Sequence, residues 1–399
     1  MTELGKSAKS LSDLAADAEA KLTALIRQPS VTPDAKGALD LAENWLEAEG
    51  FSCHRLVFEA PDTPSVDNLF ARIGTGSPLF CFAGHLDVVP VGDEAAWSVP
   101  PFSATVTNGK IIGRGAEDMK GGVAAFIAAT FAYLRQCGGE IPGSISLLLT
   151  GDEEGPAING TVKVLEWMVK QGHAPDHCLV GEPTGVDRLG DVAKIGRRGS
   201  LNGTLSVKGK QGHVAYPHRA RNPIPPGLDF AAALLAPLDQ GTRHFEPSNL
   251  EITAIDTGNQ TTNIIPSSVT LRFNCRFNDT WTSVSLEDEL RRRLGECAAK
   301  TGFECQLETN SNAESFVTET GEFTQMISAA VTEVTGVTPQ LTTGGGTSDA
   351  RFITRVCPVV EFGLVGQTMH QVDEHIPLAD LAKLTETYLL ILERYFAAK

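Results

Sequence analysis

The chain has 399 residues, of which 42% are hydrophobic and 21% are charged, and its formal net charge at pH 7 is −16. This length and composition are typical of a globular protein with two domains. The acidic balance argues against a nucleic-acid partner, because phosphate binding needs a basic face, and against binding to an anionic membrane surface.

The cysteines and the N-terminal stretch indicate the cellular compartment. The chain has eight cysteines, and none of them forms a C-x-x-C pair, which predicts reduced thiols. The N-terminal stretch MTELGKSAKSLSDLAADAEAK contains no apolar signal core. No part of the chain approaches the ~20 consecutive apolar residues that a membrane-spanning helix requires. We therefore expect a cytoplasmic protein without a membrane partner.

Apolar runs alternate with helical stretches along most of the chain, after two amphipathic helices that are predicted over residues 13–27 and 34–49. Buried strands are predicted over residues 78–84, 144–150, 177–180 and 358–363. Further helices are predicted over residues 121–137, 160–172 and 378–399. This alternation predicts an α/β domain in which a mixed, largely parallel sheet is sandwiched by helices.

The pattern changes near residue 199, where hydrophobic and polar residues begin to alternate one by one. The elements predicted from there are a strand over 200–210, a helix over 225–238, strands over 250–256 and 268–278, a helix over 285–300 and a strand over 303–309. This β-α-β-β-α-β order is that of a ferredoxin-like α+β module. We therefore expect one domain of residues 1–198 and 312–399, into which a second domain of residues 199–311 is inserted.

Acidic residues and histidines lie at the ends of the predicted strands or just before a buried helix. They are His85, Asp87, Asp118, Glu153, Glu154, Glu182 and His370. Because the carboxyl ends of parallel strands share one edge of a sheet, we expect these side chains to converge. Each residue alone has an ordinary explanation, such as a helix cap for Asp118 or a solvated turn for Glu153 and Glu154. Together, however, so many carboxylates would repel each other unless positive charge lay among them.

Metal ions are a better source of this positive charge than arginines, because few arginines lie close in sequence to the acids. Mixed histidine and carboxylate ligation suits zinc, and cobalt and manganese fit the same donors. The adjacent Glu153 and Glu154 would then have separate roles. On an extended chain neighbouring side chains point to opposite sides, so one of them can bind a metal ion while the other faces a water molecule.

Eight motifs, taken in order, resemble those of the dimetal aminoacylase and carboxypeptidase family of metallohydrolases. The motifs are GHLDVVP, GRGAEDMKGG, TGDEEGPAINGT, GEPT, GRRGSL, GHVAYPH, TGGGTSDARF and the TMH near the C-terminus. The resemblance runs from about residue 13 to residue 395. It implies a homodimeric enzyme that hydrolyses an amide in a small-molecule substrate, with an inserted domain that forms the dimer contact and acts as a lid.

The resemblance also implies a set of metal ligands for two divalent ions per subunit, zinc or cobalt. His85 and Glu182 would hold one ion. Glu154 and His370 would hold the other, and Asp118 would bridge the two.

Three further residues would act in catalysis if the resemblance holds. Glu153 would be the general base that takes a proton from the attacking water. Asp87 would fix the orientation of the His85 ring. His213, in the motif GHVAYPH, would reach the active site of the partner subunit and help to bind the oxyanion.

The substrate is implied by the motifs DEEGPAINGT and GRRGSL, which are similar to the branch of the family that acts on a succinylated diamino dicarboxylic acid. Arg197 and Ser200 are the first residues that we expect to bind its carboxylates. The second group is Asn263 together with Gly345, Gly346 and Thr347 of a glycine-rich loop. Backbone N–H groups of glycines can approach an anion closely, although an ordinary turn would have the same composition. Gly366 departs from this branch, which has asparagine four residues before the last ligand histidine.

Two alternatives remain at this point. One is a related amidohydrolase, such as an acetylornithine deacetylase or an aminoacylase, which would share the chemistry and differ only in its substrate pockets. The other is a metal-binding homologue that has lost catalysis. The presence of Glu153 and of all five ligand positions argues against the second alternative.

Overall fold

The computed structural model describes residues 11–397, and residues 1–10 and 398–399 lie outside the described part. The chain forms two compact units. The larger unit contains the described residues up to Ile195, then Thr318–Thr342 and the residues from Ser348 onward. The smaller unit, called here the inserted unit, contains Gly196–Val317 and Thr343–Thr347. No helix within residues 11–397 is long and apolar enough to span a membrane.

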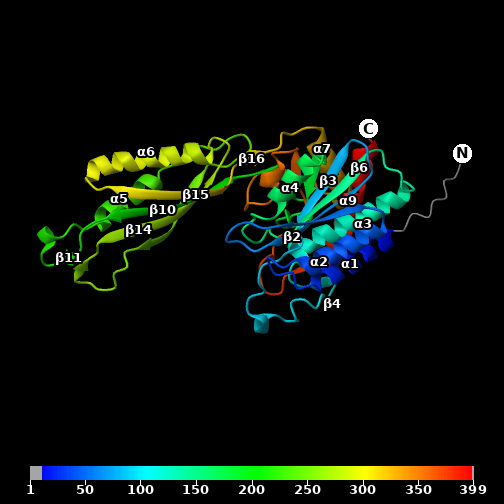
Figure 1. Ribbon diagram of the computed structural model, residues 1–399, viewed down its shortest axis with the longest axis horizontal. Coiled ribbons are helices and arrows are strands. Elements are labelled where there is room, and N and C mark those ends of the chain that lie inside the picture. The colour runs from blue at the N-terminus through cyan, green and yellow to red at the C-terminus, as the bar shows by residue number, and fades with distance from the viewer. Residues whose placement is uncertain (1–10, 398–399) are drawn as a thin grey trace. The chain divides into compact units, whose positions relative to one another are not determined.

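An eight-stranded sheet forms the centre of the larger unit (Figure 1). Its strands, in spatial order, are β1 (Ser52–Phe58), β2 (Val66–Ile73), β6 (Ser144–Thr150), β3 (Leu79–His85), β7 (His177–Val180), β18 (Val359–Glu361), β8 (Val192–Lys194) and β17 (Gln340–Thr342). The four consecutive strands β6, β3, β7 and β18 are parallel. The predicted mixed, largely parallel sheet is therefore confirmed.

Strands β8 and β17 of this sheet were not predicted from sequence, and neither were β1 and β2. Strands β1 and β2 form an antiparallel pair at one edge, in the register Ser52↔Arg72 to Phe58↔Val66. β1 has no fully buried residue, because it is the outermost strand. An edge strand of this kind lacks the continuous apolar run by which the central strands were recognised.

Helices surround the sheet of the larger unit. They are α1 (Leu11–Ile26), α2 (Lys36–Ala48), α3 (Gly121–Gln136), α4 (Thr161–Lys170), α7 (Glu322–Thr335), α8 (Ala350–Ile353) and α9 (Leu378–Ala397). Helix α3 packs against α1 and α9 and is buried from Gly121 to Leu134 (Figure 1). A Cβ atom on Gly122 would lie 2.4 Å from the carbonyl oxygen of Gly181. Glycine at this position therefore allows the start of α3 to approach the end of β7.

Smaller elements complete the larger unit. A three-stranded sheet contains β4 (Thr105–Thr107), β5 (Lys110–Ile112) and β19 (His375–Pro377) in the order β19-β5-β4. A 3-10 turn covers Glu94–Ala96, and a π-type turn covers Ala116–Lys120 directly before α3.

The inserted unit has the predicted β-α-β-β-α-β order. Its elements are β10 (Gly199–Lys208), α5 (Ile224–Leu234), β12 (Asn249–Asp256), β14 (Ser268–Phe277), α6 (Ser283–Thr301) and β15 (Cys305–Ala313). The four strands form an antiparallel sheet in the order β12-β14-β10-β15. Short strands β9 (Gly196–Arg197), β11 (Gly212–His213), β13 (Ile264–Ile265) and β16 (Phe316–Val317) and a 3-10 turn over Pro217–Arg219 lie outside this sheet.

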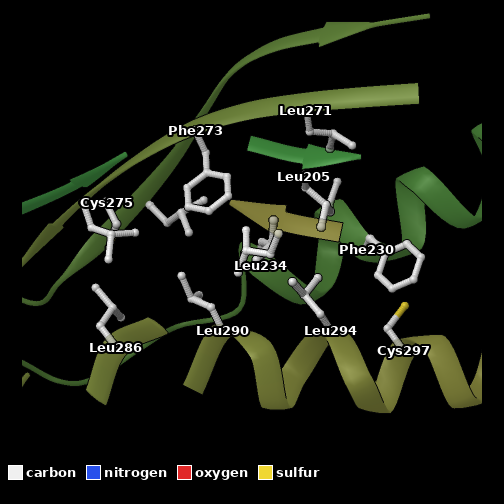
Figure 2. Close-up of a cluster of buried hydrophobic side chains, with 14 of the residues drawn as sticks. Leu205, Phe230, Leu234, Leu271, Phe273, Cys275, Leu286, Leu290, Leu294 and Cys297 are labelled. Carbon is white, nitrogen blue, oxygen red and sulfur yellow. The ribbon is translucent and has the colours of Figure 1, made fainter. Parts of the chain in front are cut away.

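The hydrophobic core of the inserted unit lies between its sheet and its two helices. Leu205 and Phe273 of the sheet, Phe230 of α5 and Leu290 of α6 point toward one another (Figure 2). Residues of β10 and β14 alternate between this core and the other face of the sheet, as the sequence pattern predicted. Helix α5 ends at Leu234, four residues before the end predicted from sequence.

Candidate metal and catalytic site

Three neighbouring parallel strands deliver most of the candidate residues to one edge of the sheet. His85 is the last residue of β3, and Asp87 follows two residues later. Glu153 follows β6, and Glu182 follows β7. Since β6, β3 and β7 are adjacent and parallel, their carboxyl ends lie side by side. The strand order alone therefore brings these side chains together.

Two further candidates reach the same edge from turns. Asp118 lies in the turn before α3 and has an extended backbone, with φ −121° and ψ 102°. His370 lies between β18 and β19 and has a left-handed backbone, with φ +63°. Its side chain is 47% exposed, whereas that of Asp118 is 9% exposed.

The two oxygens of the Asp118 carboxylate face two different groups of side chains. Oδ1 lies 3.1 Å from Nε2 of His85, and this nitrogen is 3.8 Å from a carboxylate oxygen of Glu182. Oδ2 lies 3.3 Å from Nε2 of His370, which is 2.9 Å from Oε1 of Glu154. Asp118 thus connects a His85–Glu182 group with a His370–Glu154 group.

The donors of this cluster fit a pair of divalent ions. Potential ligand atoms lie within 4.8 Å of one another in two sets, His85–Asp118–Glu154 and His85–Glu153–Glu182. Nitrogen donors of histidine and oxygen donors of carboxylates are the ligands that zinc takes in proteins. The second set contains Glu153, so both neighbouring glutamates lie close to the potential ligands.

The pKa values show that the cluster attracts positive charge. Hydrogen bonds to Asp118 and Glu154 raise the pKa of His370 to about 10. Burial raises the pKa of Glu153 well above its ordinary value, and the neighbouring Glu182 and Asp349 carboxylates raise it further. In the absence of a metal ion, protons therefore supply positive charge to this group of carboxylates.

Asp87 holds the turn that carries the two adjacent glutamates. Its carboxylate accepts hydrogen bonds from the backbone N–H groups of Glu153 (3.3 Å) and Glu154 (3.1 Å). This turn is bent, so the expectation that both glutamates lie on extended chain is wrong. The ring of His85 hydrogen-bonds through Nδ1 to the backbone carbonyl of Asp87 at 2.9 Å, and its distance to the Asp87 carboxylate is 3.6 Å. Asp87 therefore contacts both His85 and the glutamate turn.

Several buried charged residues beside the cluster were not identified from sequence as site residues. Glu374 binds the Arg114 guanidinium at 2.7 Å, and its other oxygen accepts hydrogen bonds from the N–H groups of Glu117 and Asp118. Lys120 donates to the carbonyl of Gln28 at 2.9 Å. The available signal was that Glu374 follows His370 by four residues, and that Arg114 and Lys120 flank Asp118.

The residues predicted to bind substrate all lie in the inserted unit, where Arg197 and the glycine-rich loop are in contact. Nη1 of Arg197 donates a hydrogen bond to the carbonyl of Gly346 at 3.2 Å. Gly345 has φ +99°, and a Cβ atom there would lie 2.9 Å from this Nη1, so glycine suits both the backbone and the close approach. Thr347 is the last residue of this segment of the inserted unit. Ser200 is buried on β10, and its hydroxyl accepts from Nδ2 of Asn274 at 3.1 Å.

His213 and Asn263 are neighbours in a second part of the inserted unit. Strand β11, which contains His213, pairs with β13, and the N–H of Val214 donates to the carbonyl of Asn263 at 3.1 Å. His213 is exposed, and its Nδ1 accepts a hydrogen bond from the N–H of Ala215 at 3.0 Å. A neutral His213 in this arrangement carries its proton on Nε2 and can donate it to an oxygen.

Comparison with known proteins identifies the class of this protein. Residues 81–394 match Peptidase family M20/M25/M40. The chain belongs to this family. Solved structures with the same fold include aminopeptidase PepT from Bacillus cereus, with a TM-score of 0.78 at 20% identity, over 96% of this chain and 99% of that one. The metallo-carboxypeptidase Sso-CP2 from Sulfolobus solfataricus has a TM-score of 0.76 at 17% identity, over 96% and 99% of the two chains.

Two relatives with more than 50% sequence identity to this chain have the same name. A succinyl-diaminopimelate desuccinylase from Rhodopseudomonas palustris (strain BisA53) is 54% identical over 378 residues, which are 94% of this chain and 97% of that protein. A protein of the same name from Methylobacterium nodulans is 55% identical over 373 residues, covering 93% and 94% of the two chains.

Proposed function

We propose that this protein is a metal-dependent amidohydrolase that cleaves N-succinyl-LL-2,6-diaminopimelate to succinate and LL-2,6-diaminopimelate, in lysine and diaminopimelate biosynthesis. The observation that carries the proposal is the Asp118 carboxylate, which faces His85 with one oxygen and His370 with the other. The substrate is supported by relatives of 54–55% identity over nearly the whole chain that are named for this reaction.

The proposed ligands are His85 and Glu182 for one ion, Glu154 and His370 for the other, and Asp118 for both. Zinc or cobalt suits this donor set, and manganese fits it as well. When bound, two such ions polarise the amide carbonyl and lower the pKa of a water molecule towards ~7.

Glu153 is the proposed general base and acid. Its carboxylate lies within 4.8 Å of the potential ligand atoms of His85 and Glu182 without being one of the proposed ligands, so it can take a proton from a water molecule held there and return it. It takes a proton from the attacking water as the new carbon–oxygen bond forms at the carbonyl carbon. It then passes this proton to the amine nitrogen as the carbon–nitrogen bond breaks. Asp87 keeps Glu153 in place through the bent turn that it binds.

Residues of the inserted unit are proposed to bind the rest of the substrate. The carboxylates of the substrate would be bound by the six residues predicted from sequence, namely Arg197, Ser200, Asn263, Gly345, Gly346 and Thr347. The Arg197–Gly346 hydrogen bond supports this assignment, because it holds the glycine-rich loop beside a cationic side chain. His213, with a proton available on Nε2, would bind the oxyanion, and loss of one such donor typically costs ~10²–10³ in rate.

A steady-state comparison of two substrates tests the proposed specificity. We expect a clearly higher kcat/KM for N-succinyl-LL-2,6-diaminopimelate than for acetylornithine, because the proposed contacts recognise the additional carboxylates. Release of succinate and of acetate is measured on the same zinc-loaded sample. A preference for acetylornithine would instead assign the protein to the related deacetylases.

A homodimer through the inserted unit is proposed as part of this function, with the unit also acting as a lid. Helix α5 exposes Leu228 (57%), the residue after it is the exposed Leu235 (51%), and β12 exposes Ile255 (55%). Strand β12 is an edge of its sheet, and no strand within residues 11–397 pairs with its outer side. A second copy that covers this apolar edge would satisfy both features.

The double substitution Leu228→Glu and Leu235→Glu is expected to give a monomer, because four carboxylates would meet across a symmetric interface. Turnover is expected to fall by ~10²–10³, since each His213 would no longer reach a partner subunit. Sedimentation and activity are measured on the same samples. Val169→Glu, at a position of the larger unit that is 51% exposed, is the control. A double variant that stays dimeric, or a wild type that is monomeric and active, would contradict this interface.

A cytoplasmic location is proposed with this function. All eight cysteines are free, and five of them are buried, which supports a reducing compartment.

A further inference from the structure

Glu117, which the proposed mechanism does not use, connects the two turns that carry Asp118 and His370. Its side chain is almost completely buried, and the whole residue is 1% exposed. Both carboxylate oxygens accept from the N–H of Thr368, with Oε2 at 3.0 Å and Oε1 at 3.2 Å. Oε2 also accepts a hydrogen bond from the hydroxyl of Thr368. Glu117 immediately precedes Asp118, and Thr368 is two residues before His370, so this contact ties one turn to the other.

Glu374, which lies beyond His370 in the chain, also connects the two turns, because its carboxylate binds the turn that carries Asp118. Oε1 of Glu374 accepts from the N–H groups of Glu117 (2.9 Å) and Asp118 (3.2 Å). Its Oε2 binds Arg114 at 2.7 Å. Glu374 therefore holds the backbone of Asp118, whereas Glu117 holds the backbone of the residues before His370. The two carboxylates have different targets although they join the same segments.

The two histidines of the cluster are supported unequally. His85 ends a central strand that is paired on both sides, and its ring is fixed by the carbonyl of Asp87. His370 has a half-exposed side chain and lies in an irregular turn. Thr368 anchors this turn, because its hydroxyl accepts from the N–H of His375 at 3.1 Å while it donates to Glu117. Removal of the Glu117 carboxylate would therefore free the turn of His370 and leave His85 in place.

We propose that Glu117 is a positioning residue that fixes His370 against Asp118 and thereby sets the affinity for one of the two metal ions. This inference rests on the proposed function, since the ion concerned is the one assigned to His370 and Glu154. The affinity for the ion assigned to His85 and Glu182 should not change, because strand pairing and the carbonyl of Asp87 hold His85 independently of Glu117. Loss of a group that orients a metal ligand typically costs ~10–100-fold in metal affinity. A selective effect of this size distinguishes positioning from a general contribution to stability.

Stepwise zinc binding by the metal-free full-length protein, measured by competition with a chromogenic chelator, tests the inference. Wild type is expected to bind two ions. Glu117→Ala is expected to weaken one of the two binding steps by ~10–100-fold and to leave the other unchanged. Glu117→Gln keeps one acceptor oxygen and is expected to lie between Glu117→Ala and wild type. Thr368→Val removes the hydroxyl, and with it both the donor to Glu117 and the acceptor of the His375 N–H, and should weaken the same step.

Gln371→Ala is the matched control, because Gln371 is exposed in the same turn and its side chain donates a hydrogen bond to the carbonyl of Gln367 and not to Glu117. Thermal unfolding of each metal-free variant reports whether it is folded, and if Glu117→Ala does not fold, Glu117→Gln and Thr368→Val carry the test. Equal weakening of both steps, or no weakening in any variant, would overturn the positioning role. A wild type that does not bind two ions would instead overturn the proposed function on which the role rests.

Discussion

Glu153→Gln is expected to lower turnover by about 10²–10⁴-fold, the usual contribution of a general acid–base residue, while the metal content stays near two ions per subunit. The amide has nearly the shape of the carboxylate but cannot take a proton from water or return one to the leaving amine. The Asp87 carboxylate binds the backbone of residue 153 and not its side chain, so the turn should keep its conformation.

Elemental analysis and steady-state kinetics on the same preparation measure this effect. Glu166→Gln makes the same chemical change at an exposed position of α4 and is the control. Turnover equal to that of wild type would remove Glu153 from its proposed role. Loss of one ion would instead identify Glu153 as a metal ligand. This alternative is specific, because Glu153 belongs to the His85–Glu153–Glu182 set of potential ligands. Full metal content without turnover would support the assignment of Glu153 as the base.

Removal of the metal ions is expected to abolish turnover completely and to make the stability of the folded protein depend on pH. In the metal-free protein, burial and neighbouring carboxylates raise the pKa of Glu153 well above its ordinary 4.5, and hydrogen bonds raise that of His370 from 6.5 to about 10. The folded state therefore binds these two protons more tightly than the unfolded chain does. The stabilising effect of the His370 proton is complete below pH 6.5 and is lost as the pH rises towards about 10. That of the Glu153 proton is complete below pH 4.5 and is lost as the pH rises through the raised pKa of Glu153.

Thermal unfolding at several pH values, with and without zinc, measures this dependence. The melting temperature of the metal-free protein is expected to fall from pH 6.5 to pH 10, the interval between the pKa of His370 in the unfolded chain and its pKa in the folded protein. Added zinc should raise the melting temperature, by an amount that corresponds to about 2.7 kcal/mol for each site at which free zinc is 100 times Kd. It should also restore turnover, and cobalt should do the same. A fully active sample without bound metal would contradict the proposed chemistry.

The sequence predicted those strands and helices whose burial produces a clear pattern of apolar residues. The runs at residues 144–150 (SISLLLT) and 177–180 (HCLV) are mostly apolar, and they are the central strands β6 and β7. The one-by-one alternation after residue 199 is the half-buried strand β10. Strand β1 lacks a pattern of this kind, because it is an outer strand without a fully buried residue. Its pairing with β2 depends on neighbours that its own residues do not specify.

The amino-acid sequence by itself determined which acids and histidines follow buried strands, because apolar periodicity can be recognised in it. Only the tertiary structure decided which atoms meet. His370 and Glu154 are 216 residues apart, yet their side chains lie 2.9 Å from each other. The contact of Glu117 with Thr368 spans 251 residues in the same way. Contacts of this kind depend on how folded segments pack, and no local pattern of residues records that packing.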